Sequence, residues 1–340
     1  MPSRHHQQTI DDHSSEEGIQ LHLFQVLPFT MEFSCDLVGL AHEGIATEGS
    51  PYWNAVVACA VIISICWVTS ILSRNYSQVD KIWSIMPFVY TWFPVCDTRT
   101  FVMASLATIW GLRLTWNFNR RGGYHWPPWQ GDEDYRWEII RNGGFIKFLT
   151  NPVAWHIFNF GFISLYQNLL LLAIAAPSYV AYTMATSCES ASNQLHVLDY
   201  VASGLFLSFL VIESLADNDQ YTFQTEKYRL KNENLNLTGE YADGFKQSGL
   251  YSIVRKPNYA AEQSIWISFY LFTIASGAKW NNWAGLGCVL LVQLFALSGW
   301  FTEKITRTKY PAYNDYMKRV PLYIPNAFSF SGGTCKPKAT

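Results

Sequence analysis

The feature that most constrains this fold is a set of long segments without charged side chains. Residues 54–72 and 150–188 contain no Asp, Glu, Lys or Arg. A helix needs about 20 apolar residues to cross the hydrocarbon core of a bilayer. Charged residues make up 15% of the 340-residue chain, below the roughly 25% that is typical of soluble proteins. We therefore expect an integral membrane protein.

The expected architecture is all-α, a multi-pass integral membrane helical bundle of about seven transmembrane helices. The segments expected to span the bilayer are residues 54–72, 82–96, 101–118, 155–176, 195–216, 263–278 and 283–301. The second and third segments are short, and a re-entrant hairpin is the alternative for them. Pro177 is expected to end the fourth segment, because proline interrupts the hydrogen bonds of a helix.

Three regions follow one another along the chain. Residues 1–50 form a polar N-terminal segment that we expect to be partly disordered, residues 51–326 a membrane-embedded domain, and residues 327–340 a basic tail. Of the 24 Lys and Arg residues, 20 fall after residue 301 or in the loops 73–81, 119–152 and 217–261. Positive charge marks the cytosolic side of a membrane protein, so these loops and the C-terminus are expected to be cytosolic.

The expected partner is the lipid bilayer, and the oligomeric state stays open. The net charge of −2 generates no global field that would favour a nucleic acid. The terminal sequence KPKAT, with Lys336 and Lys338, resembles a di-lysine retrieval signal of the endoplasmic reticulum. We therefore expect the protein in the membrane of that compartment.

Ionisable side chains inside a membrane are costly and usually functional. In the expected topology Asp80, Arg113, Glu213, Asp217 and Glu262 all lie at the cytosolic ends of their segments. This predicts one shared site, and the alternative is a set of internal ion pairs such as Asp80 with Arg113. No spacing of Cys or His is typical of a metal centre, so no metal is expected.

Residues 249–266 join a glycine-hinged basic loop to an apolar helix. Pro257 suits the first helical turn, which would place the helix N-terminus beside Arg255 and Lys256. A helix N-terminus next to cations favours phosphate binding. Glu262 follows at the mouth of the apolar segment. The alternative is a basic loop at the membrane surface in which Glu262 only caps the helix.

The stretch GLYSIVRKPNYAAEQSIW at 249–266 resembles the C-terminal signature of the steroid 5α-reductase-like superfamily, and within it the DUF1295 branch. Further stretches that agree are NYSQVDKIWSIMP at 75–87, WGLRLTWNFNRRGGY at 110–124, EDYRW at 133–137, ADNDQYTFQTEKYR at 216–229 and KYPAYNDYMKRVPLYIP at 309–325. The resemblance extends over about residues 53–326 in the same order.

The resemblance implies a membrane oxidoreductase that transfers a hydride from NADPH to a C=C bond of a lipid or sterol-like substrate. The implied catalytic residues are Asp80, Trp110 and Glu262. Asp80 stands where the steroid reductases have Glu, Trp110 where they have a catalytic Tyr, and Lys256 where the signature has His. Together with the cations of this membrane face, the residues expected to bind the cofactor are Arg113, Asn117, Arg120, Arg121, Asp217, Arg229, Arg255, Lys256, Asn258 and Tyr259.

Two alternatives stay open. Lipid and isoprenylcysteine methyltransferases of the same fold carry a similar R-H-P-x-Y element and use S-adenosylmethionine. They usually have an acidic pair after the last span, where this chain has Glu303 followed by Lys304. The other alternative is a non-catalytic lipid-binding membrane protein, which the replacement of the catalytic Tyr by Trp110 would suit. The identity of the substrate stays open in every case.

Overall fold

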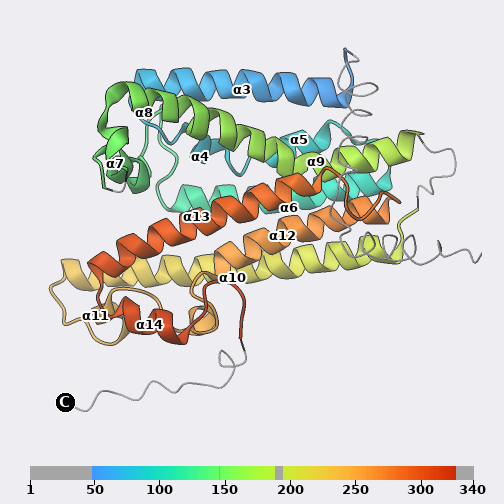
Figure 1. Ribbon diagram of the computed structural model, residues 1–340. Coiled ribbons are helices and arrows are strands. Elements are labelled where there is room, and N and C mark those ends of the chain that lie inside the picture. Colours follow the sequence, from blue (N-terminus) through green and yellow to red (C-terminus); the bar gives the residue numbers. More distant parts are fainter. Residues whose placement is uncertain (1–47, 145, 188–193, 327–340) are drawn as a thin grey trace, which may run out of the picture.

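The computed structural model describes residues 48–144, 146–187 and 194–326, and within these residues it contains helices and no strand (Figure 1). The expected all-α class is therefore confirmed. The first half of the described chain forms α3 (Pro51–Ser73), α4 (Gln78–Ile82), α5 (Met86–Trp92), α6 (Thr98–Arg120), α7 (Tyr135–Arg141), the 3₁₀-helix η1 (Lys147–Thr150) and α8 (Pro152–Phe158).

The second half begins with a π-helix, η2, that joins α8 to the next long helix. Its elements are η2 (Asn159–Tyr166), α9 (Gln167–Ser187), α10 (Val197–Asn232), α11 (Glu240–Asp243), the 3₁₀-helix η3 (Gly249–Ser252), α12 (Pro257–Ala275), α13 (Gly285–Lys309) and α14 (Tyr313–Arg319). The tail 327–340 and most of the segment 1–50 lie outside the described residues.

Four helical stretches of the described chain are long and apolar enough to cross a membrane. They are Pro51–Ser73, the continuous stretch Pro152–Thr186, Val197–Asn232 and Gly285–Lys309. Membrane embedding is thereby supported, while the count of seven spans is not confirmed. The expected span 82–96 is interrupted, because α5 has seven residues and a helix of that length extends about 10 Å.

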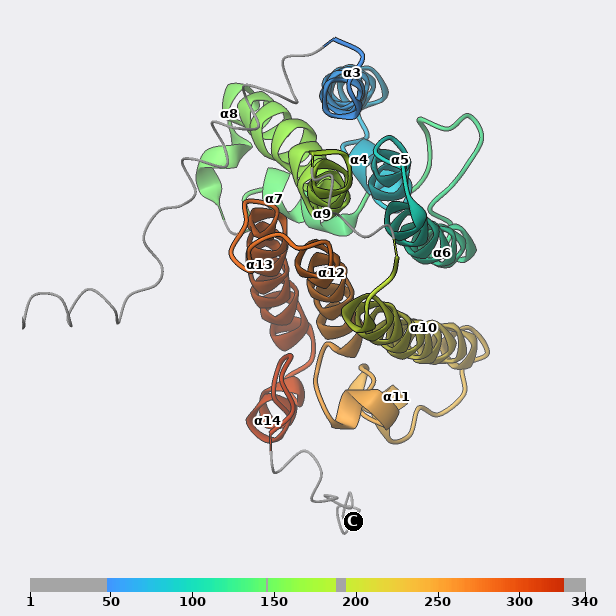
Figure 2. The ribbon, with the colours of Figure 1, turned by 90° about the vertical axis from the view of Figure 1, so that its right-hand side faces the viewer.

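Two further long helices, α6 and α12, cover most of the expected spans 101–118 and 263–278 but carry more polar residues. α12 packs against α6, α9, α10 and α13, and it lies between α10 and α13 when the bundle is viewed end-on (Figure 2). Its side chains Trp266, Phe269 and Phe272 are fully buried. α12 is therefore a central helix, and polar side chains such as Glu262 and Thr273 lower its hydropathy although they are buried against other helices.

Local sequence signals place the first residues of α12 and α6. α12 begins at Pro257, as expected from the suitability of proline for the first turn. The Asp97 carboxylate accepts a hydrogen bond from the Thr100 amide, and the Thr100 hydroxyl bonds back to the Asp97 backbone, so the two form a capping box that starts α6.

The expectation that Pro177 ends a span is wrong, because α9 continues through this residue to Ser187. Pro177 has no amide hydrogen for the carbonyl of Ala173, one turn earlier in the helix. Gly287 of α13 packs on that same carbonyl, where a Cβ atom would clash with the Ala173 oxygen. Neighbouring helices commonly make proline tolerable within membrane helices, and here α13 covers the interrupted turn closely.

Candidate active site

A cavity of about 820 Å³ lies among α4, α6, α7, α8, η2, α10, α12 and α13. Segments that are far apart in sequence therefore contribute to one site. Seven of the thirteen site residues expected from sequence line this cavity, namely Asp80, Asn117, Arg121, Asp217, Asn258, Tyr259 and Glu262. The structure thus brings these seven residues to one cavity.

Asp217 is the centre of a buried polar group that we name the Asp217 cluster (Arg113, Asn117, Glu213, Asp217 and Asn258). Its Oδ2 atom lies 2.6 Å from Nη1 of Arg113 and 2.9 Å from Nδ2 of Asn117. Its Oδ1 atom accepts a hydrogen bond from Asn258 at 3.2 Å. Arg113 also forms an ion pair with Glu213. The Arg113 guanidinium therefore neutralises two carboxylates and does not line the cavity.

Glu262 is held by two indole rings. Trp110 donates its Nε1 hydrogen to Oε2 of Glu262 at 2.9 Å, and Trp266 donates to Oε1 at 3.0 Å. Glu262 is 4% exposed, and Trp110 is fully buried. An indole has a single N–H donor, so the donor of Trp110 is already committed to Glu262. In this arrangement Trp110 positions Glu262 and does not itself reach the cavity.

Asp80 lines the cavity and contacts α7, a helix from which no site residue was expected. Its Oδ2 atom accepts a hydrogen bond from Nε1 of Trp137 in α7 at 3.1 Å. Burial, followed by the nearby charge of Asp134, raises the pKa of Asp80 above its usual value. The suggested ion pair with Arg113 is not formed, because Arg113 binds Glu213 and Asp217 instead.

The segment around α7 contributes residues that sequence reasoning missed. Arg136 forms a two-pronged ion pair with Asp134 at 2.7–3.0 Å and donates to the Ser298 hydroxyl of α13 at 2.8 Å. Asp134 also caps the N-terminus of α7 through the Arg136 amide. The stretch EDYRW at 133–137 was part of the resemblance, and it was the signal from which Asp134, Arg136 and Trp137 could have been found.

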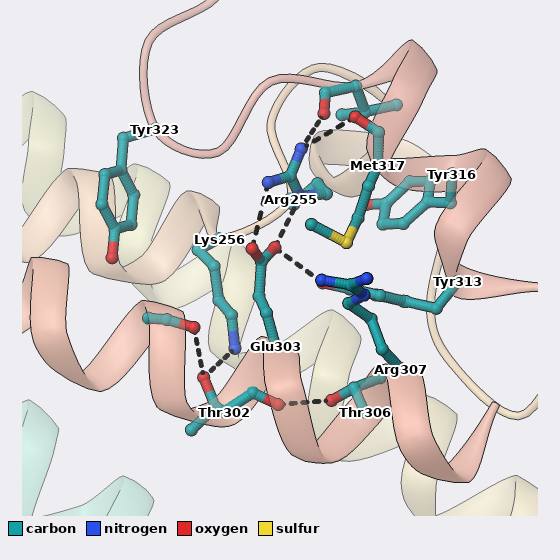
Figure 3. Close-up of polar contacts among 12 residues, drawn as sticks. Arg255, Lys256, Thr302, Glu303, Thr306, Arg307, Tyr313, Tyr316, Met317 and Tyr323 are labelled. Carbon is teal, nitrogen blue, oxygen red and sulfur yellow. Dashed lines mark hydrogen bonds and ion pairs between the residues drawn. The ribbon is translucent and has the colours of Figure 1, made fainter. Parts of the chain in front are cut away.

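Arg255 belongs to a second, closed ionic group, the Arg255 cluster (Arg255, Glu303 and Tyr313), shown in Figure 3. Its Nε and Nη2 atoms lie 2.6 and 3.1 Å from the two carboxylate oxygens of Glu303. Tyr313 donates to the same carboxylate at 3.0 Å, and Nη1 of Arg255 binds the carbonyls of Met317 and Val320. Arg255 therefore anchors the C-terminal segment and does not line the cavity.

The other cations occupy different positions. Lys256 donates to the Thr302 hydroxyl at 2.9 Å, and Thr302 lines the cavity. Arg120 donates to Asn117 at 2.9 Å, and its guanidinium lies 4.4 Å from the ring centres of both Trp116 and Tyr221.

Arg229 is remote from this group. It forms exposed ion pairs with Glu226 and Glu233 near the end of α10, and it is not part of the cavity lining. Of the cations expected to bind phosphate, Arg121 alone lines the cavity within the described part of the chain, while Arg120 and Lys256 contact residues that do.

The geometry defines a helical membrane protein with a buried ionic site at one cavity. The chain belongs to the DUF1295 family, described as "Protein of unknown function (DUF1295)", which matches residues 66–320. An uncharacterized protein of Schizosaccharomyces pombe is 31% identical over 294 residues, which cover 81% of this chain and 80% of that protein. No solved structure matches the chain. The family expected from the sequence motifs is therefore confirmed.

Proposed function

We propose that this protein is an NADPH-dependent reductase of a polarised C=C bond in a lipid-like substrate. The observation that carries the proposal is the composition of the cavity lining. The lining combines a half-buried acid, Asp80, with the acceptors Asp217, Asn258 and Glu262 and with an extended apolar surface. These are the groups that a proton donor, a nucleoside site and a lipid site require.

The residues present fit the uncharged half of the cofactor. Carboxylate and amide oxygens of Asp217, Asn258 and Glu262 are acceptors that suit ribose hydroxyls and a carboxamide NH₂ group. The phosphates would be held away from these acids, by Arg121 in the cavity lining and by Arg120, which contacts Asn117. When bound, NADPH supplies a hydride, and its ring becomes positively charged. The carboxylates of Asp217 and Glu262 are the groups that would stabilise positive charge in this cavity.

Asp80 is the acid that this proposal requires. Because its pKa is raised, Asp80 keeps a proton to higher pH than an exposed aspartate and can donate it to a substrate carbonyl. The indole N–H of Trp137 donates to Oδ2 of Asp80, and this hydrogen bond orients the carboxyl group. Trp110 and Trp266 have a different task, since they hold Glu262 in place.

The rest of the cavity lining is largely aromatic and suits a substrate with an apolar body. Aromatic side chains of α8, η2 and α13 line it, including Phe158, Phe162 and Phe295. Leu297 and Trp300 line the cavity and are also 56% and 58% exposed on the outside of α13, a helix long and apolar enough to span a membrane. This supports access to the cavity from the side of the lipid.

S-adenosylmethionine-dependent methyl transfer is the second candidate, and the acidic wall favours it in one respect. The sulfonium of that cofactor is positively charged, so carboxylates would bind it well. Its positive charge is lost during transfer, however, so the same carboxylates would oppose the reaction. Glu303, the acid that follows the last span, is bound by Arg255 and Tyr313 and does not reach the cavity lining.

We also propose an endoplasmic reticulum location with a cytosolic C-terminus. The distribution of Lys and Arg among the loops supports the orientation. Lys336 and Lys338, which suggested the compartment, lie outside the described residues. Fluorescence protease protection of a C-terminal tag in permeabilised cells would test the orientation, and immunofluorescence of the untagged chain would test the compartment.

The experiment that tests the function is calorimetric titration of the detergent-purified chain with NADPH and, separately, with S-adenosylmethionine. Binding of NADPH followed by its oxidation with a panel of enone lipids would support the reductase. Binding of S-adenosylmethionine alone would transfer the proposal to methyl transfer. Binding of neither by folded protein would favour the non-catalytic alternative.

A further inference from the structure

The loop between α6 and α7, residues 121–134, presents two tryptophan side chains at its tip. Trp126 is 89% exposed and Trp129 is 50% exposed. An indole ring is large and mostly apolar, so its exposure to water is unfavourable. Pro127 and Pro128 lie between the two tryptophans, and each proline fixes its own φ angle. The tip is therefore a restrained aromatic surface that the described residues leave uncovered.

Hydrogen bonds tie this loop to the segment that follows α3. Three side chains of residues 75–81 donate to carbonyl oxygens of the loop at 2.8–3.1 Å, namely Asn75 to Gly131, Lys81 to Gln130 and Gln78 to Trp129. From the loop, the Tyr124 hydroxyl donates to the Lys81 carbonyl at 2.7 Å. α3 is long and apolar enough to cross a membrane and ends at Ser73. The loop is thus held at the level where α3 leaves the bilayer.

The loop extends in the plane of the membrane. Viewed along the bundle, it projects outward beside α5 and α6, across the direction of the helix axes (Figure 2). A loop that continued along the helix axes would enter the aqueous phase. A sideways loop at the end of a membrane-spanning helix lies instead against the lipid surface.

Other exposed residues mark the same level. Trp116 of α6 is 58% exposed and lies one turn before the helix end from which the loop departs. Arg74, the exposed residue that follows α3, places a cation where lipid phosphates lie. Trp53, at the opposite end of α3, is 39% exposed. Tryptophan is enriched at both interfaces of a membrane, and these positions agree with that distribution.

We propose that the loop between α6 and α7 docks on the bilayer and inserts Trp126 and Trp129 among the phospholipid headgroups of the leaflet where α3 ends. There the ring buries its apolar body, and its N–H group reaches headgroup oxygens. The inference does not depend on the proposed reaction. Gly122 at one end of the loop and Asp132 at the other line the cavity, so the depth of the loop also sets the depth of this part of the lining.

The test uses the full chain, labelled with 5-fluorotryptophan, in phosphatidylcholine nanodiscs. Fluorine NMR signals are assigned with single variants such as Trp126→Phe and Trp129→Phe, which remove exposed rings and should leave the fold intact. A phosphatidylcholine with a nitroxide on its headgroup should broaden the signals of both residues at least as strongly as that of Trp53. The signal of Trp155, which is 3% exposed, is the control and should stay sharp.

Two results would overturn the inference. Broadening of the Trp126 and Trp129 signals by a water-soluble gadolinium chelate, without an effect of the nitroxide lipid, would place the tip in water. Protection from both reagents would show that protein covers the tip, for example a second copy of the chain. If the fluorinated chain does not fold, quenching of the natural chain by dibrominated phosphatidylcholine decides. The quenched fraction should be smaller in Trp126→Phe than in the wild type, and equal fractions would contradict docking.

Discussion

The Asp217 cluster and the Arg255 cluster are built from the same residue types, yet they differ in what they leave open. In the Arg255 cluster one guanidinium meets one carboxylate, and a tyrosine and two carbonyls satisfy the remaining groups. In the Asp217 cluster Arg113 pairs with both Glu213 and Asp217, Arg121 pairs with Asp217 from outside the cluster, and both carboxylates also line a cavity. A closed cluster anchors a chain segment, whereas an open one can bind a ligand.

The largest expected effect comes from neutralising Asp80, an acid that lines the same cavity as the Asp217 cluster. Asp80→Asn keeps the shape of the side chain and removes the transferable proton. Loss of a positioned acid typically costs about 10²–10⁴-fold in rate, so we expect turnover to fall by at least about 100-fold. NADPH affinity and thermal stability should change little. Asp315→Asn, an exposed aspartate of α14 outside the cavity lining, is the control, and equal turnover of the two variants would contradict the role of Asp80.

A second prediction concerns the Arg255 cluster, from which the cation is removed. Arg255→Ala leaves the Glu303 carboxylate buried without its cation, which we expect to destabilise the fold by about 3 kcal/mol. Thermal unfolding in detergent measures this effect. Arg229→Ala is the matched control, because Arg229 also pairs with two glutamates but in an exposed position, and its unfolding should change little.

The same variant separates anchoring from phosphate binding. NADPH affinity should persist in the Arg255→Ala protein that remains folded, because Arg255 does not line the cavity. A large loss of affinity at wild-type stability would show that Arg255 binds the cofactor after all.

α13 contributes to both regions, because Glu303 belongs to the Arg255 cluster and Ser298 lines the cavity. Gly287 lets α13 approach α9 at the Ala173 carbonyl. Gly287→Ala should force the helices apart and cost about 1–3 kcal/mol through overpacking. Gly204→Ala is the control, since a Cβ there meets no atom within 4 Å. Equal melting temperatures of the two variants would show that α13 is not seated by this contact.

The smallest expected effect is a dependence of stability and turnover on pH, which we expect from Asp80 at the cavity and not from the Arg255 cluster. The folded state holds a proton on Asp80 at pH values where the unfolded chain has lost it. Stability should therefore fall as the pH rises from about 4 through the raised pKa of Asp80. Turnover should fall over the upper part of the same window, because the proton donor is lost. Chemical denaturation at several pH values measures the first effect, and Asp80→Asn should reduce its slope.

Much of the local structure could be predicted from sequence because its causes are local. Pro257 starts α12, and the uncharged stretch 54–72 lies within α3. The seven-span count was harder to predict, since α5 is short and α12 is polar for reasons of packing. Pro177 misled the prediction because its effect on the helix depends on Gly287 of another helix.

The candidate site shows the same division. The sequence predicted that the ionisable residues share one site, and seven of the expected residues do line one cavity. It could not tell that Trp110 would face Glu262, or that Arg255 would face Glu303, because these partners are 152 and 48 residues apart in the chain.

By itself, the sequence determined the class of protein, its membrane character and its family, since hydropathy, helix ends and motifs are properties of contiguous residues. Only the tertiary structure decided which charges are paired. The energy of a buried charge depends on the atoms within a few ångströms, and packing brings those atoms from distant parts of the chain. Arg113 and Arg255 look alike in the sequence, but Arg113 pairs with two acids that line a cavity and Arg255 is enclosed by its partners.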